Sequence, residues 1–150
     1  MAHARTQIRN AVAAQLTGLA LTGAHVFVNR LHKLVKAELP ALIVRTDDES
    51  IDAIGVGFPS PLERRLVLGI ECVAIANAAL DTTLDDLIEQ VEFAMSASPL
   101  AVELGGLAKS VRLQSVAIDI EADADVPVGR AELRYEITYF TPENQPDVAS

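Results

Sequence analysis

The sequence is poor in the residues that build stacking surfaces and crosslinks. Its 150 residues include no tryptophan, two tyrosines, four phenylalanines and one cysteine. So few aromatic side chains disfavour a stacking platform for single-stranded nucleic acid. Because one cysteine can form neither an internal disulfide nor a paired-cysteine metal site, we expect the chain to work in a reducing compartment.

Long apolar runs are also lacking. No segment approaches the roughly 18 apolar residues that suggest a membrane-spanning helix, and Arg5 and Arg9 interrupt the short apolar stretches near the N-terminus. We therefore expect neither a membrane span nor a secretion signal. Half of the residues are nevertheless apolar and 22% are charged, which is the balance of a globular chain with room for one domain.

Basic residues are scarce beyond the N-terminal third. Residues 1–46 carry six basic side chains and one acidic side chain, a net charge of +5, whereas residues 47–150 carry six and twenty, a net charge of −14. The total of −9 argues against a duplex-binding surface. The asymmetry suits a basic arm for nucleic acid, and equally a contact between the basic part of one copy and the acidic part of another.

Periodicity in the first half of the chain predicts one helix and two strands. Apolar residues at helical spacing, with alanines between them, predict a helix over about 4–17. Strands are expected at 25–28 and 41–46, and the segment 30–38 is open between helix and loop. Glycine and proline gather in the segment 47–63, which predicts a long loop.

The second half begins with two strong patterns. Residues 64–76 alternate with apolar side chains on both faces, which predicts a central strand. A helix is expected next, with a polar side chain at 81–83 as its N-terminal cap, apolar residues every three or four positions, and an end at Pro99.

Two further strands complete the expected sheet. Residues 111–121 and 130–141 alternate, and the apolar set changes parity within the first of them, which predicts a β-bulge near Gln114-Ser115. The polar tail 142–150 is expected to be flexible. This order predicts a single α+β domain over residues 1–150, with a largely antiparallel or mixed sheet of about five strands packed against two main helices.

The search for catalytic and cofactor motifs finds none. The glycine pair at 55–57 precedes Phe-Pro-Ser-Pro, which cannot open a phosphate-binding helix. Cys72 lies mid-strand among apolar residues, as a buried hydrophobe does. His3, His25 and His32 lack metal-ligand spacing. We therefore expect no catalytic, cofactor-binding or metal-binding residues, and no enzymatic activity.

One row of carboxylates leaves a choice open. Asp119, Glu121, Asp123 and Asp125 alternate, so an extended backbone would place them on one face. A weak cation site, for example between subunits, is one interpretation. A solvated strand end is the interpretation that the pattern favours, because the glycine and terminal glutamate of an EF-hand loop are missing.

The whole arrangement resembles a known family. The residues that carry the likeness are the opening helix with Ile8, Arg9 and Val12, and the segments Glu38–Val44, Arg64–Leu68, Leu84–Glu92 and Leu133–Tyr139. Together they resemble siphophage tail terminator proteins, the minor tail protein U-like family. The resemblance implies an α+β subunit of a hexameric ring that caps the tail tube, ends its polymerisation and offers a surface to the head. Such a chain is encoded by a phage, a prophage or a gene transfer agent.

The resemblance also implies partners and a location. The partners would be further copies of this chain, the tail tube protein and a head-completion or connector protein, with no membrane and no sequence-specific nucleic acid, although DNA could pass through the ring. The protein would assemble in the cytoplasm of the host bacterium and end at the head-proximal end of the virion tail.

The charge asymmetry suggests which residues meet in such a ring. We predict that Arg5, Arg9, Arg30 and Lys33 contact the acidic part of the next subunit, and that the 47–63 loop docks on the tube or the head. The nearest alternative is another head–tail connector, neck or tail completion protein. A more remote one is a small ligand-binding domain or enzyme with a pocket under the glycine- and proline-rich loop.

Overall fold

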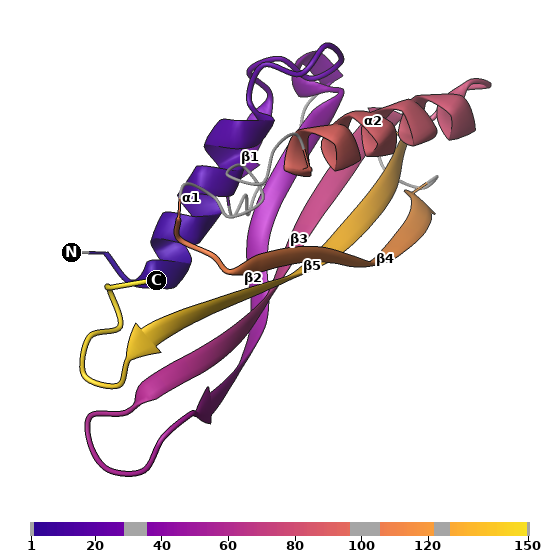
Figure 1. Ribbon diagram of the computed structural model, residues 1–150. Helices are drawn as coiled ribbons and strands as arrows, with labels where there is room; N and C mark the ends of the chain where they lie inside the picture. The colour runs from indigo at the N-terminus through magenta and orange to yellow at the C-terminus, as the bar shows by residue number, and fades with distance from the viewer. Residues whose placement is uncertain (1, 29–35, 97–105, 122–126, 150) are drawn as a thin grey trace.

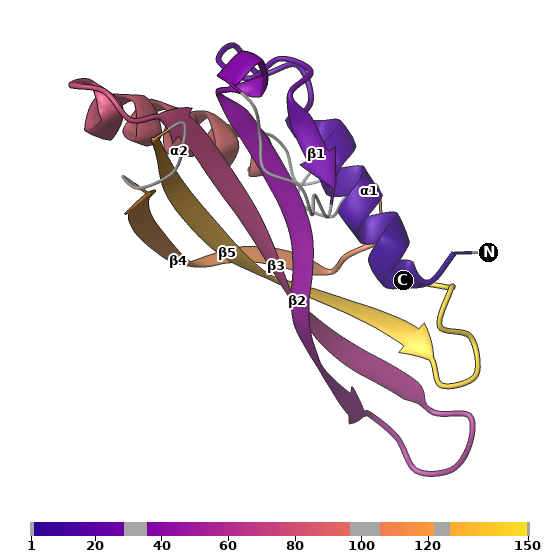
Figure 2. The ribbon, with the colours of Figure 1, turned by 180° about the vertical axis from the view of Figure 1, so that it is seen from behind.

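The computed structural model describes residues 2–28, 36–96, 106–121 and 127–149. It shows an α+β fold in which two helices lie on one face of a five-stranded sheet (Figures 1 and 2). In chain order the elements are α1 (Ala4–Leu16), β1 (Val26–Val28), the 3-10 turn η1 (Lys36–Glu38), β2 (Ala41–Ala53), β3 (Pro61–Ile75), α2 (Leu80–Met95), β4 (Ser110–Glu121) and β5 (Val128–Pro142). The predicted fold class is therefore confirmed.

The sheet is mixed and mostly antiparallel, with strand order β1-β2-β3-β5-β4. The segment predicted as the central strand is β3, which pairs antiparallel with β2 and β5. β1 is parallel to β2 and covers only three of its residues. The predicted β-bulge is confirmed by a register shift between Leu113 and Ser115, and a second shift that the sequence did not predict lies between Thr46 and Glu49.

The core lies between the helices and the sheet and is largely aliphatic. The buried stripe of α1 is the predicted one, with Ile8, Val12 and Leu16 fully buried. α2 contributes Leu84 and Val91, among others, against alternate residues of β3 and β5. On the other face of the sheet, a smaller apolar cluster lies at the β1 end and contains Ile43, Val73 and Val128.

The prediction of a long loop over 47–63 is wrong. β2 continues to Ala53 and β3 begins at Pro61, so only residues 54–60 connect them. The two strands pair with each other as far as Ala53 and Leu62, and β5 supports β3 from its other side. Glycine and proline correctly indicated a turn at residues 54–60. The composition of the residues on either side did not indicate that they are paired strands. We call residues 49–65 the arm; it forms the hairpin at the bottom of Figure 1.

Three smaller expectations differ from the structure or lie beyond it. The N-cap of α2 is Ala79, with no side-chain cap, instead of a polar residue at 81–83. Residues after Pro142, expected to form a flexible tail, return to α1, where the carbonyl of Pro146 accepts a hydrogen bond from Ala4 N at 2.9 Å. The stop at Pro99 and most of the ambiguous segment 30–38 lie outside the described residues.

Candidate functional site

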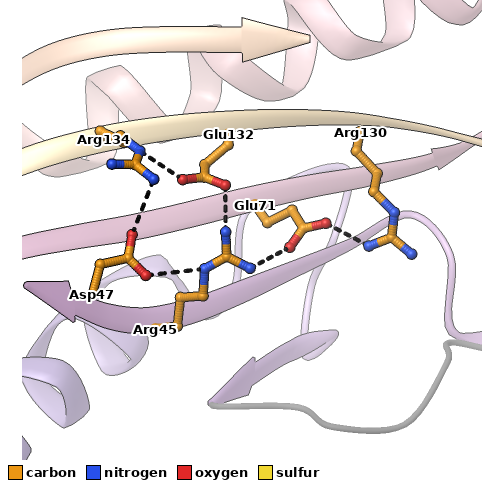
Figure 3. Close-up of polar contacts among 6 residues, drawn as sticks. All are labelled: Arg45, Asp47, Glu71, Arg130, Glu132 and Arg134. Atoms are coloured by element: carbon orange, nitrogen blue, oxygen red, sulfur yellow. Dashed lines mark hydrogen bonds and ion pairs between the residues drawn. The ribbon is translucent and has the colours of Figure 1, made fainter. Parts of the chain in front are cut away.

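The face of the sheet that the helices leave uncovered carries a ladder of alternating charges. Figure 3 shows its six members, which we call the charge ladder: Arg45 and Asp47 of β2, Glu71 of β3, and Arg130, Glu132 and Arg134 of β5. Arg45 lies at its centre and contacts Asp47, Glu71 and Glu132. Because three positive and three negative side chains neutralise one another, the ladder is a low-charge surface and not a site for an anion or a cation.

Gly69 of β3 provides the space for the middle of the ladder. A Cβ atom at this position would lie 3.4 Å from Glu132 Oε1, 3.5 Å from Asp47 Oδ2 and 3.6 Å from Arg45 Nε. A glycine within a strand marks such a close approach. The sequence carried a partial signal for the ladder in the alternating charges of β5, but the partners on β2 and β3 could not be paired with them without the register.

A second polar group is buried on the helix-bearing face, where the arm begins. Glu49 accepts hydrogen bonds from Arg64 Nη1, at 2.9 Å, and from the hydroxyl of Tyr139. Arg64 Nε also donates to Thr141 Oγ1 at 2.8 Å. The side chains of Glu49 and Arg64 are 3% and 8% exposed. These contacts hold β2, β3 and β5 together near the second β-bulge, so we interpret the group as structural.

The predicted interface residues of α1 partly serve the fold itself. Arg5 is half exposed and its Nε lies 4.0 Å from Glu49 Oε1. Arg9 turns toward β2, where Nη1 lies 3.4 Å from Thr46 Oγ1, and its Nε is buried without a hydrogen-bond partner among the described residues. The other two predicted interface residues, Arg30 and Lys33, lie outside the described residues.

The turn of the arm exposes apolar side chains. Val56 is fully exposed, Phe58 is 76% exposed and Ile54 is more than half exposed. Figures 1 and 2 show that the arm projects away from both helices. Several large apolar side chains on one projecting turn are typical of a contact surface for another protein.

The edge strand β4 exposes a second apolar row. Val116, Ile118 and Ile120 point to the helix-bearing face, as do their partners on β5, yet they are 41%, 57% and 52% exposed. The helices do not cover this edge, since α2 lies over β3 and β5. An edge strand with an apolar face is a ready template for pairing with another chain.

The outer side of α2 is acidic and holds a shallow open hollow. The helix carries five carboxylates and no basic side chain. The hollow, of about 530 Å³, is lined by Asp85, Ile88, Glu89, Glu92, Phe93 and Ser96. The hydroxyl of Ser96 donates to the backbone carbonyl of Glu92 at 2.7 Å, so it is not held by a carboxylate of the hollow as an activated nucleophile would be.

Cys72 and His3 lie in surroundings that shift their pKa values. Cys72 is buried on β3, and burial raises the pKa of its thiol to about 12. The pKa of His3 is lowered, first by burial and then by the nearby charge of Arg5. In the described ranges no three His, Cys, Asp or Glu side chains gather as metal ligands would. Of the carboxylate row, Asp123 and Asp125 lie outside those ranges.

Comparisons with known proteins add no family. No protein-family model matches the chain, and no curated protein matches it at a significant level. Within the described part of the chain, no helix has the length and apolarity needed to cross a membrane.

Proposed function

We propose that the protein is a phage tail terminator, a structural subunit that forms a ring on the end of the tail tube. The observation that carries the proposal is the arm, with Ile54, Val56 and Phe58 exposed at its turn. A projecting apolar turn gains stability when it is buried against another protein. In a ring, several such arms would lie side by side and would bind together to the end of a tube of the same symmetry.

The charge distribution supports assembly of identical copies. α1 carries Arg5 and Arg9 and no acidic residue, whereas α2 carries five acidic residues and no basic one. Opposite charges on separate surfaces of one chain favour contact between different surfaces of neighbouring copies. Contacts of this head-to-tail kind generate a closed ring when the rotation between copies completes a circle.

The proposal is tested by removing the gene from the bacterium that produces the particles and imaging the tails by electron microscopy. We expect tails of uncontrolled length without heads, because nothing would end polymerisation of the tube. Tails of normal length that carry no head would instead indicate that the protein is a head–tail connector, which is the second candidate. Normal virions would contradict both.

The arm is tested separately with the purified protein. The variant Val56→Ser/Phe58→Ser should bind isolated tail tubes at least tenfold more weakly, because two large apolar side chains would no longer be buried there. Phe93→Ser removes an equally exposed aromatic side chain from α2 and serves as the control. Equal tube binding by the arm variant and the natural protein would remove the arm from the tube contact.

A further inference from the structure

Among the residues that the structure describes, the sheet has two edges without a further strand. At one of these edges β4 has β5 as its described partner, and its residues from Arg112 to Ile120 are exposed on both faces. At the other edge, β1 covers only Leu42–Val44 of β2, and no described residue pairs with the outer side of β2 from Arg45 to Ala53. Two uncovered edges of one sheet can pair with each other in neighbouring copies.

Hydrogen bonds within the sheet determine which residues of β2 offer backbone groups at the open edge. Ile54 N donates to Pro61 O at 2.9 Å. Because opposite residues of an antiparallel pair alternate between bonded and non-bonded, the backbone groups of Asp52 point to β3 and those of Ile51 and Ala53 point outward.

On β4, the residues that offer backbone groups at the open edge follow from the hydrogen bonds of β5. Ala76 N donates to Pro127 O, so alternation along β5 directs the backbone groups of its even-numbered residues to β4. The backbone groups of their partners on β4, which include Arg112 and Asp119, therefore point toward β5. The residues of β4 whose backbone groups point outward are all apolar: Val111, Leu113, Val116, Ile118 and Ile120.

We propose that β4 of one copy pairs antiparallel with the Arg45–Ala53 length of β2 in the next copy, in the register that opposes Arg112 to Asp52 and Asp119 to Arg45. This inference rests on the proposed ring, for which it names the contact between subunits. The next copy is the occupant that the charges indicate, because each strand end then meets a side chain of opposite sign on the same face of the sheet.

The register matches the outward-pointing backbone groups along the whole contact. The pairs of outward residues, with the β2 residue first, are Ala53 and Val111, Ile51 and Leu113, Glu49 and Val116, and Thr46 and Ile118. Each strand contains one extra residue inside this span, between Thr46 and Glu49 on β2 and between Leu113 and Ser115 on β4. The two β-bulges therefore compensate each other, and the pairing continues across them.

The side chains also suit this contact. Arg112 makes no ion pair within the described residues, and Asp52 is 68% exposed with only a loose contact to Arg65 at 3.8 Å. On the helix-bearing face, Ile51 would lie beside Leu113, so two exposed apolar side chains would cover each other. A pairing of two β4 strands around a two-fold axis would leave the edge of β2 uncovered.

Cysteine crosslinking tests the register. Asp52 and Arg112 would form a non-hydrogen-bonded pair with Cα atoms about 4.5 Å apart, within the range of a disulfide. On mild oxidation, the double variant Asp52→Cys/Arg112→Cys should form a series of reducible multimers, from the dimer up to the hexamer. An equimolar mixture of the two single variants should stop at dimers, since each copy then offers only one thiol at the contact.

The outcomes separate this inference from the proposed function. Dimers from Arg112→Cys alone would indicate pairing of two β4 strands and overturn the proposal. Native mass spectrometry of the double variant reports ring formation independently, at about 96 kDa for six copies of 16.0 kDa. A ring without crosslinks would overturn the register and leave the tail terminator function standing, whereas absence of both crosslinks and ring would overturn the edge pairing.

A charge exchange tests the same pair without a covalent bond. Asp52→Arg and Arg112→Asp should each weaken the association of copies about fivefold, because like charges would face each other in the register. The double exchange should restore association to within about twofold. Asn144→Arg, at an exposed position of the C-terminal segment, is the control and should associate as the natural protein does, and the proposal fails if the double exchange shows no recovery over the single variants.

Discussion

At the scale of single residues, Glu49 and Arg64 show how a charged pair is kept inside the fold. Both side chains are nearly buried, and each has a second partner, the Tyr139 hydroxyl for Glu49 and the Thr141 hydroxyl for Arg64. The additional hydrogen bonds offset the cost of removing two charges from water. Loss of Arg64 would leave Glu49 buried with only the half-exposed Arg5 as a cation, 4.0 Å away, and loss of Glu49 would leave Arg64 buried without its counter-ion.

Arg64→Met should therefore destabilise the protein strongly. We expect the free energy of unfolding to fall by about 3–5 kcal/mol, because the carboxylate of Glu49 would stay buried without its main cation. Arg65→Met is the control, since that side chain is exposed, and it should leave the unfolding midpoint almost unchanged. Urea unfolding followed by circular dichroism measures both, and equal midpoints for the two variants would contradict the structural role.

Buried weak acids make the fold sensitive to alkali. Burial raises the pKa of Cys72 from 9.0 to about 12. Burial also raises the pKa of Tyr135, helped by the nearby charge of Glu92, and burial with the hydrogen bond to Glu49 raises that of Tyr139. A raised pKa in the folded state means that the stabilising contribution is complete below the unfolded pKa and is lost as the pH rises toward the folded pKa.

We therefore expect the urea midpoint to be steady near pH 8 and to fall steadily above about pH 9. Tyr135→Phe removes one titrating hydroxyl from the core, so the decline above pH 9 should be shallower in this variant. Measurements at several pH values with both proteins check the expectation. An identical decline in the variant would show that Tyr135 does not contribute to the alkaline loss.

At the scale of elements, β3 depends on Gly69 to bring the charge ladder close to the strand. Arg45, Asp47 and Glu132 all lie within 3.6 Å of the position that a Cβ atom would take. An alanine would make ordinary van der Waals contact with all three side chains, whereas a β-branched residue would overlap with them. The ladder therefore leaves room for no side chain larger than a methyl group at the centre of the sheet.

Gly69→Val tests this requirement. We expect a loss of about 1–3 kcal/mol in the free energy of unfolding, typical of overpacking, although valine itself favours strands. Thr138→Val, on the same face of neighbouring β5, is the control and should be neutral or slightly stabilising. Calorimetry measures the stability of both variants. A Gly69→Val variant more stable than the natural protein would mean that the side chains of the charge ladder shift to admit valine without loss of stability.

The elements also show what the sequence could predict. The helix over 4–16, the central strand and the β-bulge near Ser115 followed from local periodicity, because each leaves a pattern within a dozen residues. The arm did not, since hairpin pairing of β2 with β3, supported by the distant strand β5, overrode the glycine and proline content of 47–63. The charge ladder needed the register between three strands, and the apolar face of β4 became an exposed surface only once the helices were placed.

At the scale of the whole molecule, the arm carries two proposed contacts side by side. The apolar side chains of its turn would meet the tube, whereas the backbone of its outer strand, up to Ala53, would pair with β4 of the next copy, and β4 itself lies at the opposite edge of the sheet (Figure 1). Because the side chains of Val56 and Phe58 lie outside the paired residues, contact with the tube can be lost without loss of contact between copies. This separation allows the two proposals to be tested in one set of variants.

Ile118→Lys should prevent ring formation, because a charge would be placed on the apolar face of the pairing edge. Val148→Lys changes a similarly exposed residue of the C-terminal segment, and the ring should persist in it. Val56→Ser/Phe58→Ser should keep the ring mass and lose only the binding to tubes. If the arm variant lost the ring as well, the turn of the arm would also belong to the contact between copies, because a turn that met only the tube could not affect association in the absence of the tube.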